Sequence, residues 1–407
     1  MTAGPSLRGK AAIVGFGDSY CRADERKSAL QMTVEAIAAA LADAGLEKSD
    51  LDGLLSGRAP LSDMRPQWNN IVAAYAKLTP TYASEITIHA AGMNAMLKHA
   101  AMAVTCGIAR FVVCIGADAA ASMPDVRAAI SNVDADPEFE QPYGPIIPSI
   151  YAQLACRLMH EHGMAERDMS EVAVQCQEWA VHHPFSAKGR KGRVTVEEVE
   201  RSPMVASPLR LWHCAPWGPP GTAGALIVAS AEDARALRPD PVYLLGFGEC
   251  QTHEYLTDRM ALRSSRLPLG ALPNITATGC AVAGRLAYEM AGLGPRDIDM
   301  AQTASQFAHI ELMSLAELGF TTLPEAGAFV ASGATGPRGA LPTNTNGGWL
   351  SFGQPGVSCV MDSLVEQVRQ LRGVALGLQV PDVGIGLVHA NGGMAACHSV
   401  TIMGREP

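Results

Sequence analysis

Charged residues are scarce in this chain of 407 residues. Asp, Glu, Lys and Arg make up 17% of the sequence, and hydrophobic residues make up 48%. Soluble proteins usually carry about a quarter charged residues, and disordered chains combine low hydrophobicity with high net charge. The composition therefore excludes disorder of the whole chain. It also indicates that surface is buried between subunits, and we expect a homodimer.

Long apolar runs and concentrated positive charge are missing as well. No stretch reaches the roughly 18 apolar residues of a membrane-spanning helix. The net charge is -9, and the basic residues are scattered, whereas nucleic-acid binders normally carry a basic face. We therefore expect neither a membrane nor a nucleic acid as a partner.

The ten cysteines lie far apart and form no C-x-x-C pair. Zinc sites and disulfide frameworks have characteristic short spacings, so the pattern favours free thiols and no metal site. Reduced thiols are typical of a cytoplasmic protein. The first apolar run is too short and too broken by glycine for a signal peptide, which favours the same compartment.

The chain contains an internal repeat. Apolar runs at 11–17 and 242–248 both end in Gly-Phe-Gly and predict buried strands. Each is followed by a helical pattern that ends in Ala-Gly-Leu and a short acidic turn, at 44–52 and at 291–299. A glycine at that point is typical of a helix C-terminus. Two such units in the same order predict two duplicated α/β halves.

The rest of the chain fits this division. Further buried strands are predicted at 111–116, 225–230, 383–388 and 398–403. Strands that alternate with helices predict parallel or mixed sheets covered on both faces. We assign 1–235 to an N-terminal half, with an inserted loop region at about 119–211, and 236–407 to a C-terminal half.

Several motifs give the chain a resemblance to the thiolase superfamily. The most specific are Asn344-Thr345-Asn346-Gly347-Gly348, Ser351-Phe352-Gly353-Gln354-Pro355-Gly356 and His389-Ala390-Asn391-Gly392-Gly393. The chain most resembles the branch near the sterol carrier protein X thiolases, which includes acyltransferases and aldolases that work with a small OB-fold partner. The resemblance implies mixed five-stranded sheets in αβαβα layers, an acyl-CoA substrate and an OB-fold partner subunit. It implies no cofactor, since coenzyme A belongs to the substrate.

The catalytic groups of that family are replaced in this chain. The resemblance places His89 where the family has a nucleophilic cysteine at a helix N-terminus, and His389 where it has a second cysteine. Ala304 and Gln354 occupy the positions of two catalytic histidines. In the thiolase-like aldolases, which also lack the cysteine, tyrosines stand at those two positions. The acyl-enzyme mechanism of the thiolases depends on the thiolate, so we expect a different mechanism here.

The replacing side chains suit general acid–base chemistry. His89 and His389 can titrate near neutral pH, and Gln354 can hold a thioester oxygen by hydrogen bonds. The alternative is structural: His89 caps a helix in an inactive site, His389 donates to a backbone carbonyl, and Gln354 only packs.

Glycine-rich loops supply the remaining candidates. Backbone N–H groups around Gly392 and Gly393 can form an oxyanion hole. Asn346 and Asn391 lie on such loops, where a ligand can approach closely. We predict that a basic stretch in the inserted region binds the phosphates of coenzyme A. The alternative is that this stretch is only a solvated loop. A second basic group further along the chain is a weaker candidate. The first group is Lys188, Arg190, Lys191 and Arg193, and the second is Arg259, Arg263 and Arg266.

This set predicts an enzyme that acts on the C2–C3 bond of a CoA thioester without a cysteine nucleophile. A base and an enolate-stabilising hole suit retro-aldol cleavage of a 3-hydroxyacyl-CoA in the degradation of a lipid or bulky side chain. One alternative is a Claisen-type acyltransferase or thiolase. Another is a non-catalytic subunit that binds acyl-CoA or scaffolds an active partner.

Overall fold

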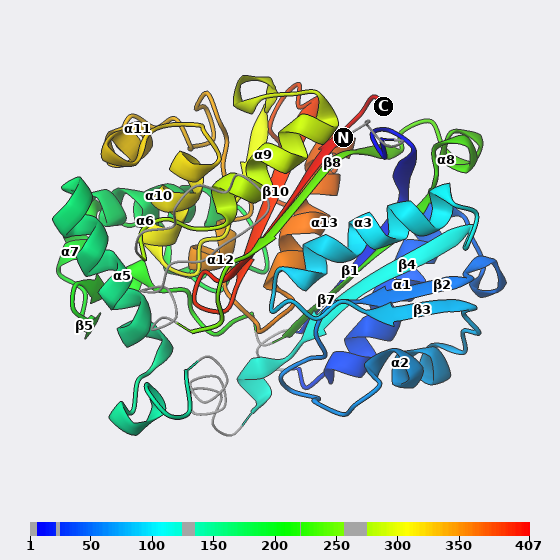
Figure 1. Cartoon of the computed structure of the whole chain (residues 1–407), viewed down its shortest axis with the longest axis horizontal. Helices are drawn as coiled ribbons and strands as arrows, with labels where there is room; N and C mark the ends of the chain where they lie inside the picture. Colours follow the sequence, from blue (N-terminus) through cyan, green and yellow to red (C-terminus); the bar gives the residue numbers. More distant parts are fainter. Residues whose placement is uncertain (1–5, 22–24, 124–134, 220, 256–274) are drawn as a thin grey trace.

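The structure is a computed structural model that describes residues 6–21, 25–123, 135–219, 221–255 and 275–407. Within these residues, strands from both halves of the chain form one nine-stranded sheet. Figure 1 shows the first part of the N-terminal half, in blue and cyan, beside the C-terminal half in yellow to red. None of the helices in the described ranges is both long and apolar enough to cross a bilayer.

The N-terminal half contributes five strands. Their spatial order is β3 (Tyr82–Glu85), β2 (Gly53–Ser56), β4 (Phe111–Asp118), β7 (Gly221–Ser230) and β1 (Ala11–Cys21). β2 runs parallel to β3 and β4, while β7 runs antiparallel to both β4 and β1. β1, β4 and β7 confirm the strands predicted from the apolar runs in this half.

The C-terminal half contributes four strands among the residues that the structure describes. Their order is β8 (Val242–Gln251), β11 (Cys397–Gly404), β10 (Ile385–Gly392) and β9 (Met300–Gln302). We expected five strands here, as in the first half. The two sets join where Ala12 pairs with Tyr243 and Ile13 with Val242. This short pairing makes one continuous sheet of two parts that the sequence predicted as separate.

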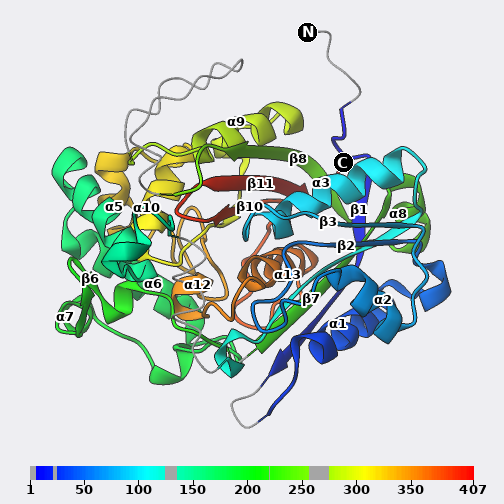
Figure 2. The same ribbon diagram turned by 60° about the horizontal axis from the view of Figure 1, so that its bottom comes forward.

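Helices cover and separate these two parts. α3 (Gly92–Thr105) and α13 (Cys359–Arg372) pack against strands of both halves, so they form a central layer. α1 (Ala29–Ala44) covers the outside of the N-terminal strands, and α9 (Cys280–Ala291) covers the outside of the C-terminal strands. Figure 2 shows the resulting succession from α9 through α13 to α1. The predicted αβαβα layering is confirmed.

The repeated Gly-Phe-Gly has a packing reason. Gly15 and Gly17 on β1 lie against backbone carbonyls of α1, and Gly246 and Gly248 on β8 lie against backbone carbonyls of α9. A Cβ at any of these positions would collide with the helix backbone, because packed interiors leave no spare volume. The repeated glycines therefore let each outer helix approach its strand closely.

The helix ends predicted from the repeat are also present. Gly45 ends α1 with φ 67°, and Gly292 ends α9 with φ 62°, both in the left-handed region that glycine adopts without strain. A short 3-10 turn follows each of them, at η1 (Lys48–Asp50) and η7 (Pro295–Asp297). The chain then enters β2 in one half and β9 in the other.

The described part of the inserted region between β4 and β7 consists of short helices and strands joined by loops. Its elements are η2 (Ala120–Ser122), η3 (Gln141–Tyr143), α5 (Ile147–His162), α6 (Glu166–Ala180), η4 (Gly189–Lys191), α7 (Val196–Glu200), β5 (Met204–Ala206), β6 (Leu209–Arg210) and η5 (Leu211–His213). α6 packs against helices of the C-terminal half, namely α10 (Ala308–Glu317), α11 (Ala326–Ala331) and α12 (Gly348–Ser351).

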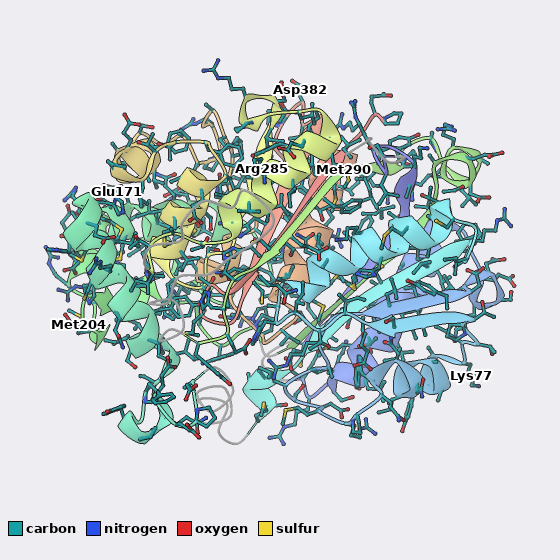
Figure 3. The ribbon with its side chains drawn as sticks, in the orientation of Figure 1. Lys77, Glu171, Met204, Arg285, Met290 and Asp382 are labelled. Carbon is teal, nitrogen blue, oxygen red and sulfur yellow. The ribbon has the colours of Figure 1, made fainter. Side chains whose placement is uncertain are left out.

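The remaining helices lie at the periphery or in a connection. They are α2 (Trp68–Ala76), α8 (Ala231–Leu237) and η8 (Leu323–Glu325). Side chains on the outer faces are exposed, as Arg285 on α9 shows (Figure 3).

Candidate functional site

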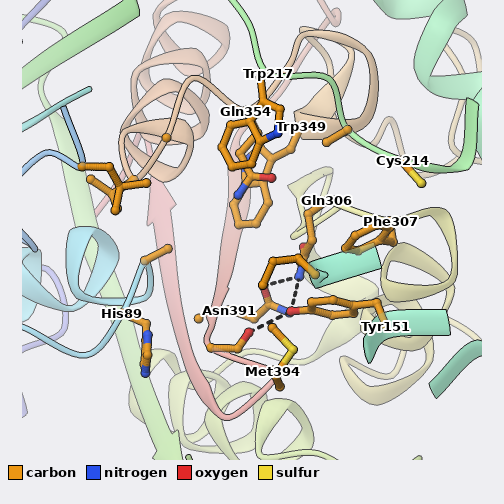
Figure 4. A pocket seen from close by; sticks show the side chains of 18 of the residues that line it. His89, Tyr151, Cys214, Trp217, Gln306, Phe307, Trp349, Gln354, Asn391 and Met394 are labelled. Atoms are coloured by element: carbon orange, nitrogen blue, oxygen red, sulfur yellow. Dashed lines mark hydrogen bonds between the residues drawn. The ribbon is translucent and has the colours of Figure 1, made fainter. Parts of the chain in front are cut away.

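A pocket lies where α3, α5, α12 and the end of β10 meet. Its cavity volume is about 150 Å³. Five residues that the sequence singled out line it together: His89, Gln354, Asn391, Gly392 and Gly393. In Figure 4 His89 lies on one side of the pocket, and Tyr151 and Phe307 lie on the other.

His89 is held at this place by an unusual backbone conformation. It precedes α3 with φ 49°, a left-handed value that side chains other than glycine rarely adopt. The Gly92 N–H donates to the His89 carbonyl across 3.2 Å, so the chain turns sharply into α3. The His89 side chain packs where Gly392 has no Cβ. The strand end and the helix start therefore fit each other only with glycine at 392.

A carboxylate orients the His89 ring. The Nε2 atom lies 2.9 Å from Oε1 of Glu254, which follows β8 and stands 165 residues away in sequence. An ionised carboxylate only accepts hydrogen bonds, so the ring carries its proton on Nε2. Nδ1 is then the basic nitrogen of the neutral ring.

A hydrogen-bonded chain of three side chains crosses the floor of the pocket. The Tyr151 hydroxyl donates to the Gly393 carbonyl across 2.8 Å and accepts from Nε2 of Gln306 across 3.0 Å. Nε2 of Gln306 also donates to Oδ1 of Asn391 across 3.0 Å. Among the described residues, this leaves Nδ2 of Asn391 and Oε1 of Gln306 buried without a protein partner. Buried polar atoms normally have partners, so this donor and this acceptor are available to a ligand.

Asp118, at the end of β4, ties two loops of the pocket together. Its carboxylate accepts hydrogen bonds from the backbone N–H groups of Leu61 at 2.9 Å and Val357 at 3.0 Å. Both residues line the pocket. Burial raises the pKa of the Asp118 carboxyl, and these donors oppose that shift by stabilising the ionised form.

His389 lies behind the pocket and is not among its lining residues. It is buried on β10, and its Nε2 is 3.0 Å from Nδ1 of His398. Nε2 of His398 is 3.1 Å from the Ala395 carbonyl, which can only accept. In the neutral pair, His398 therefore donates to that carbonyl and His389 donates to His398. Nδ1 of His389 remains a buried acceptor with no partner in the described part of the chain.

Burial controls the titration of this histidine pair. It lowers the pKa of the His389 imidazole well below its usual value, and the adjacent His398 adds to this effect. Cys280 lies close enough to make the three side chains a candidate metal cluster. However, burial raises the pKa of the Cys280 thiol well above its usual value, and the two rings are coplanar within 5°. Coplanar rings joined at 3.0 Å direct the two nitrogens at each other, which is the geometry of a hydrogen bond.

Asn346 shapes the turn before α12. Its Oδ1 accepts from the Gly348 N–H across 2.9 Å. Gly347 and Gly348 both have positive φ, at 105° and 58°. The side chain is buried and is not among the lining residues of the pocket.

The predicted coenzyme A contacts divide into one buried and three exposed side chains. Lys188 is buried, and its ammonium donates to the carbonyls of Cys214 at 2.9 Å and Trp212 at 3.3 Å. Burial lowers the pKa of Lys188 to about 7. The exposed three are Arg190, Lys191 and Arg193. The guanidinium of Arg193 pairs with Glu178 at 3.0 Å.

Their role toward coenzyme A stays a prediction. The second basic group, Arg259, Arg263 and Arg266, lies outside the described residues. Arg58 lines the pocket itself and has no ion pair with a described carboxylate. The sequence did not single it out.

Sequence reasoning also missed a cysteine in the pocket wall. Cys214 lines the cavity, and its thiol donates to the Arg210 carbonyl at 3.4 Å. Burial raises the pKa of this thiol to about 12. The thiolate is the reactive form of cysteine, so Cys214 is a poor nucleophile near neutral pH. All ten cysteines are free thiols.

The fold and the pocket at the start of α3 define a thiolase-like protein. A family model described as thiolase C-terminal domain-like matches residues 263–405. The chain is 33% identical over 408 aligned residues to 17-hydroxy-3-oxo-4-pregnene-20-carboxyl-CoA lyase of Mycobacterium tuberculosis, covering 98% of this chain and 100% of the relative. It is 32% identical over 377 residues to acetyl-CoA acetyltransferase of Methanothermobacter thermautotrophicus, covering 92% and 94%.

A solved structure of a protein named Ltp2-ChsH2(DUF35) aldolase superimposes with a TM-score of 0.84 at 31% identity, covering 98% of this chain and 99% of that chain. These similarities extend over nearly the whole length of both partners. The chain therefore belongs to the thiolase superfamily, in its branch of proteins like the sterol carrier protein 2 thiolases.

Proposed function

We propose that this protein is a lyase that cleaves the C2–C3 bond of a 3-hydroxyacyl-CoA in a retro-aldol reaction. Two relatives with coverage of nearly the whole chain are named as a lyase and an aldolase. The observation that carries the proposal is the content of the pocket. The His89 imidazole is hydrogen-bonded to the Glu254 carboxylate. Nδ2 of Asn391 is a buried amide donor without a partner among the described residues. Burial raises the pKa of the Cys214 thiol to about 12.

The reaction follows from these groups. The imidazole of His89 accepts the proton of the 3-hydroxyl, and the O–H electron pair becomes the second bond of a carbonyl at C3. The C2–C3 bond breaks, and its electron pair forms a thioester enolate. Nδ2 of Asn391 donates to the enolate oxygen. The imidazolium then returns its proton to C2, giving a carbonyl compound and a shortened acyl-CoA.

Glu254 and Gln354 have supporting roles in this scheme. Glu254 stabilises the imidazolium between the two proton transfers, because it accepts from Nε2 at 2.9 Å. Gln354 lines the same pocket and can hold the thioester oxygen before bond cleavage. The backbone at Gly392 and Gly393 completes the site, and a direct catalytic role for His389 stays a prediction without a contact to the pocket.

The proposal also includes an OB-fold partner subunit and a homodimer. The substrate brings coenzyme A, so no further cofactor is proposed. The solved relative is a complex with a DUF35 protein, which supports an OB-fold partner for this chain. β3 stands at the end of the sheet with exposed residues, and no described strand pairs with its outer edge. Such an edge is a template for pairing, which supports a homodimer. Ten free thiols support a cytoplasmic location.

A second function, Claisen-type acyl transfer, has one observation in its favour. The acetyl-CoA acetyltransferase relative is 32% identical over nearly the whole chain. That chemistry usually passes through an acyl-enzyme, for which a thiolate is the effective nucleophile. His89 would have to carry the acyl group instead, while Cys214 remains protonated.

One experiment separates the candidates. The full chain, with any partner that copurifies, is incubated with a 3-hydroxyacyl-CoA, and the carbonyl product is trapped with a hydrazine and quantified. Release of a carbonyl compound together with a shortened acyl-CoA in equal amounts supports the lyase. A covalent acyl adduct after incubation with acetyl-CoA, detected by mass spectrometry, supports acyl transfer. Neither product, in the presence of the partner, would leave a non-catalytic subunit and overturn the proposal.

A further inference from the structure

Four aromatic side chains contribute to the pocket lining. Tyr151, Trp217, Phe307 and Trp349 all line the cavity, and we call them the aromatic wall. They come from α5, the connection before β7, the connection before α10, and α12. Figure 4 shows them grouped around the cavity, with Trp217 and Trp349 on one side and Tyr151 and Phe307 on another. The reaction needs none of these rings for proton transfer.

The aromatic wall is held in place by its own contacts. The indole N–H of Trp349 donates to the hydroxyl of Ser363 across 3.1 Å. The rings of Tyr151 and Phe307 lie 4.6 Å apart at 31°, and the Tyr151 hydroxyl is bound to Gly393. Both Trp349 and Phe307 are almost fully buried. A surface whose ring faces are fixed before binding loses little conformational freedom when a ligand stacks on it.

The size of the cavity limits what the wall can hold. The volume is about 150 Å³, and an apolar cavity of roughly that volume accommodates one benzene molecule. A fused four-ring nucleus, as in a pregnene, is several times larger than one benzene ring. Because the cavity is open on one side, this volume limits the group that lies inside it and not the whole substituent on C3.

The position of the cavity shows which part of the substrate it takes. His89 and Asn391 line the same cavity as the aromatic wall. In the proposed reaction these two groups act on the 3-hydroxyl and on the thioester oxygen. The aromatic wall therefore lies close to the reacting carbons, where a substituent on C3 can reach it.

We propose that the substrate is a 3-hydroxyacyl-CoA whose C3 substituent carries an aromatic ring that packs against the aromatic wall. This inference rests on the proposed function and names the substrate class of the same site. Stacked or edge-to-face ring pairs contribute beyond simple burial of apolar area, so the wall distinguishes a ring from a short alkyl chain. Retro-aldol cleavage would release an aromatic aldehyde, or an aromatic ketone where C3 carries a second carbon substituent.

The test measures binding and cleavage separately. Binding uses 3-phenylpropionyl-CoA, which lacks the 3-hydroxyl and cannot react, against butyryl-CoA and a steroid carboxyl-CoA. Titration calorimetry on the full chain gives each Kd. We expect 3-phenylpropionyl-CoA to bind at least about tenfold more tightly than butyryl-CoA. Equal affinity for the phenyl and butyryl compounds, or tighter binding of the steroid, would overturn the inference.

Two tryptophan variants locate the effect. Trp349→Leu removes a buried wall ring, and Trp217→Leu removes a half-buried one that is less important for folding. Each is expected to reduce the phenyl preference about threefold or more, while Trp349→Phe keeps most of it. Thermal unfolding shows which variants fold. A folded Trp217→Leu and a folded Trp349→Leu that both retain the full preference would contradict the assignment.

Cleavage assays keep the two proposals apart. Incubation with 3-hydroxy-3-phenylpropionyl-CoA is followed by the absorbance of released benzaldehyde, with 3-hydroxybutyryl-CoA as the comparison. A phenyl preference in binding without cleavage of either compound would contradict the proposed lyase and leave the substrate class standing. Cleavage of the butyryl compound at an equal or higher kcat/KM would contradict the substrate class and leave the lyase standing.

Discussion

His89 and His389 occupy positions of the same predicted importance, yet they lie in different surroundings. His89 lines the pocket, keeps a partly accessible side chain and pairs with Glu254. His389 is buried on β10, hydrogen-bonds to His398 and does not line the pocket. An imidazole works as a base only where a proton can reach it and where its charged form is stabilised. His89 lies at the pocket beside a carboxylate, whereas burial disfavours the charged form of His389.

Of the substitutions that test this comparison, replacement of His89 is expected to have the largest effect. In His89→Ala the base is lost, and we expect kcat to fall by about 10²- to 10⁴-fold. The measurement is carbonyl release under saturating 3-hydroxyacyl-CoA. Circular dichroism and thermal unfolding serve as controls, because His89 holds a left-handed conformation that alanine adopts at a cost. Unchanged turnover in a folded variant would remove His89 from the mechanism.

Replacing His389 is expected to affect stability more than turnover. His389→Leu leaves Nδ1 of His398 without its donor in a buried site, which costs about 1–3 kcal/mol of unfolding free energy. In His389→Gln a side-chain amide can supply the donor and restore part of that loss. Urea unfolding of both variants tests this. A large fall in kcat at unchanged stability would show instead that His389 takes part in the reaction.

The pH dependence of stability sharpens the same comparison. An unfolded histidine has a pKa of about 6.5, whereas burial lowers the pKa of folded His389 well below its usual value. Below about pH 6.5 the unfolded state therefore binds more protons than the folded state, and the unfolding free energy falls as the pH falls. Other buried histidines act in the same direction, since burial lowers the pKa of His309 to about 3.

In His389→Gln, unfolding should take up as much as one proton fewer between pH 6 and 5. The slope of the unfolding free energy against pH should therefore fall by up to about 1.4 kcal/mol per pH unit. Urea unfolding at several pH values gives the slope. An identical slope in wild type and variant would mean that His389 is protonated in the folded protein over this range.

The smallest expected effect concerns the basic stretch in the inserted region. Arg190 is exposed and outside the pocket lining, so a contact with a coenzyme A phosphate would be an exposed ion pair worth up to about 1 kcal/mol. Arg190→Ala should raise KM up to about fivefold with kcat unchanged, and the increase should shrink in high salt. Arg285→Ala on α9 is the matched control. Equal KM values for both variants would exclude the coenzyme A role of Arg190.

The sequence predicted the architecture better than the site. The duplicated Gly-Phe-Gly strands, the helix ends at Gly45 and Gly292 and the layered halves follow from local patterns, and the structure confirms them. The joined nine-stranded sheet did not follow, because it depends on two residue pairs between distant strands. Motif alignment placed His89 and Gln354 at the pocket, but it could not show that Tyr151, Gln306 and Glu254 lie beside them.

The sequence by itself determined the two α/β repeats and the absence of cysteine before α3, because glycine spacing, apolar runs and residue identity are local properties. Only the tertiary structure decided which polar groups work together. Glu254 reaches His89 across 165 residues, and Gln306 joins Tyr151 to Asn391. Burial and hydrogen-bond partners set the charge and tautomer of a side chain, and both arise from contacts between segments that are far apart in the chain.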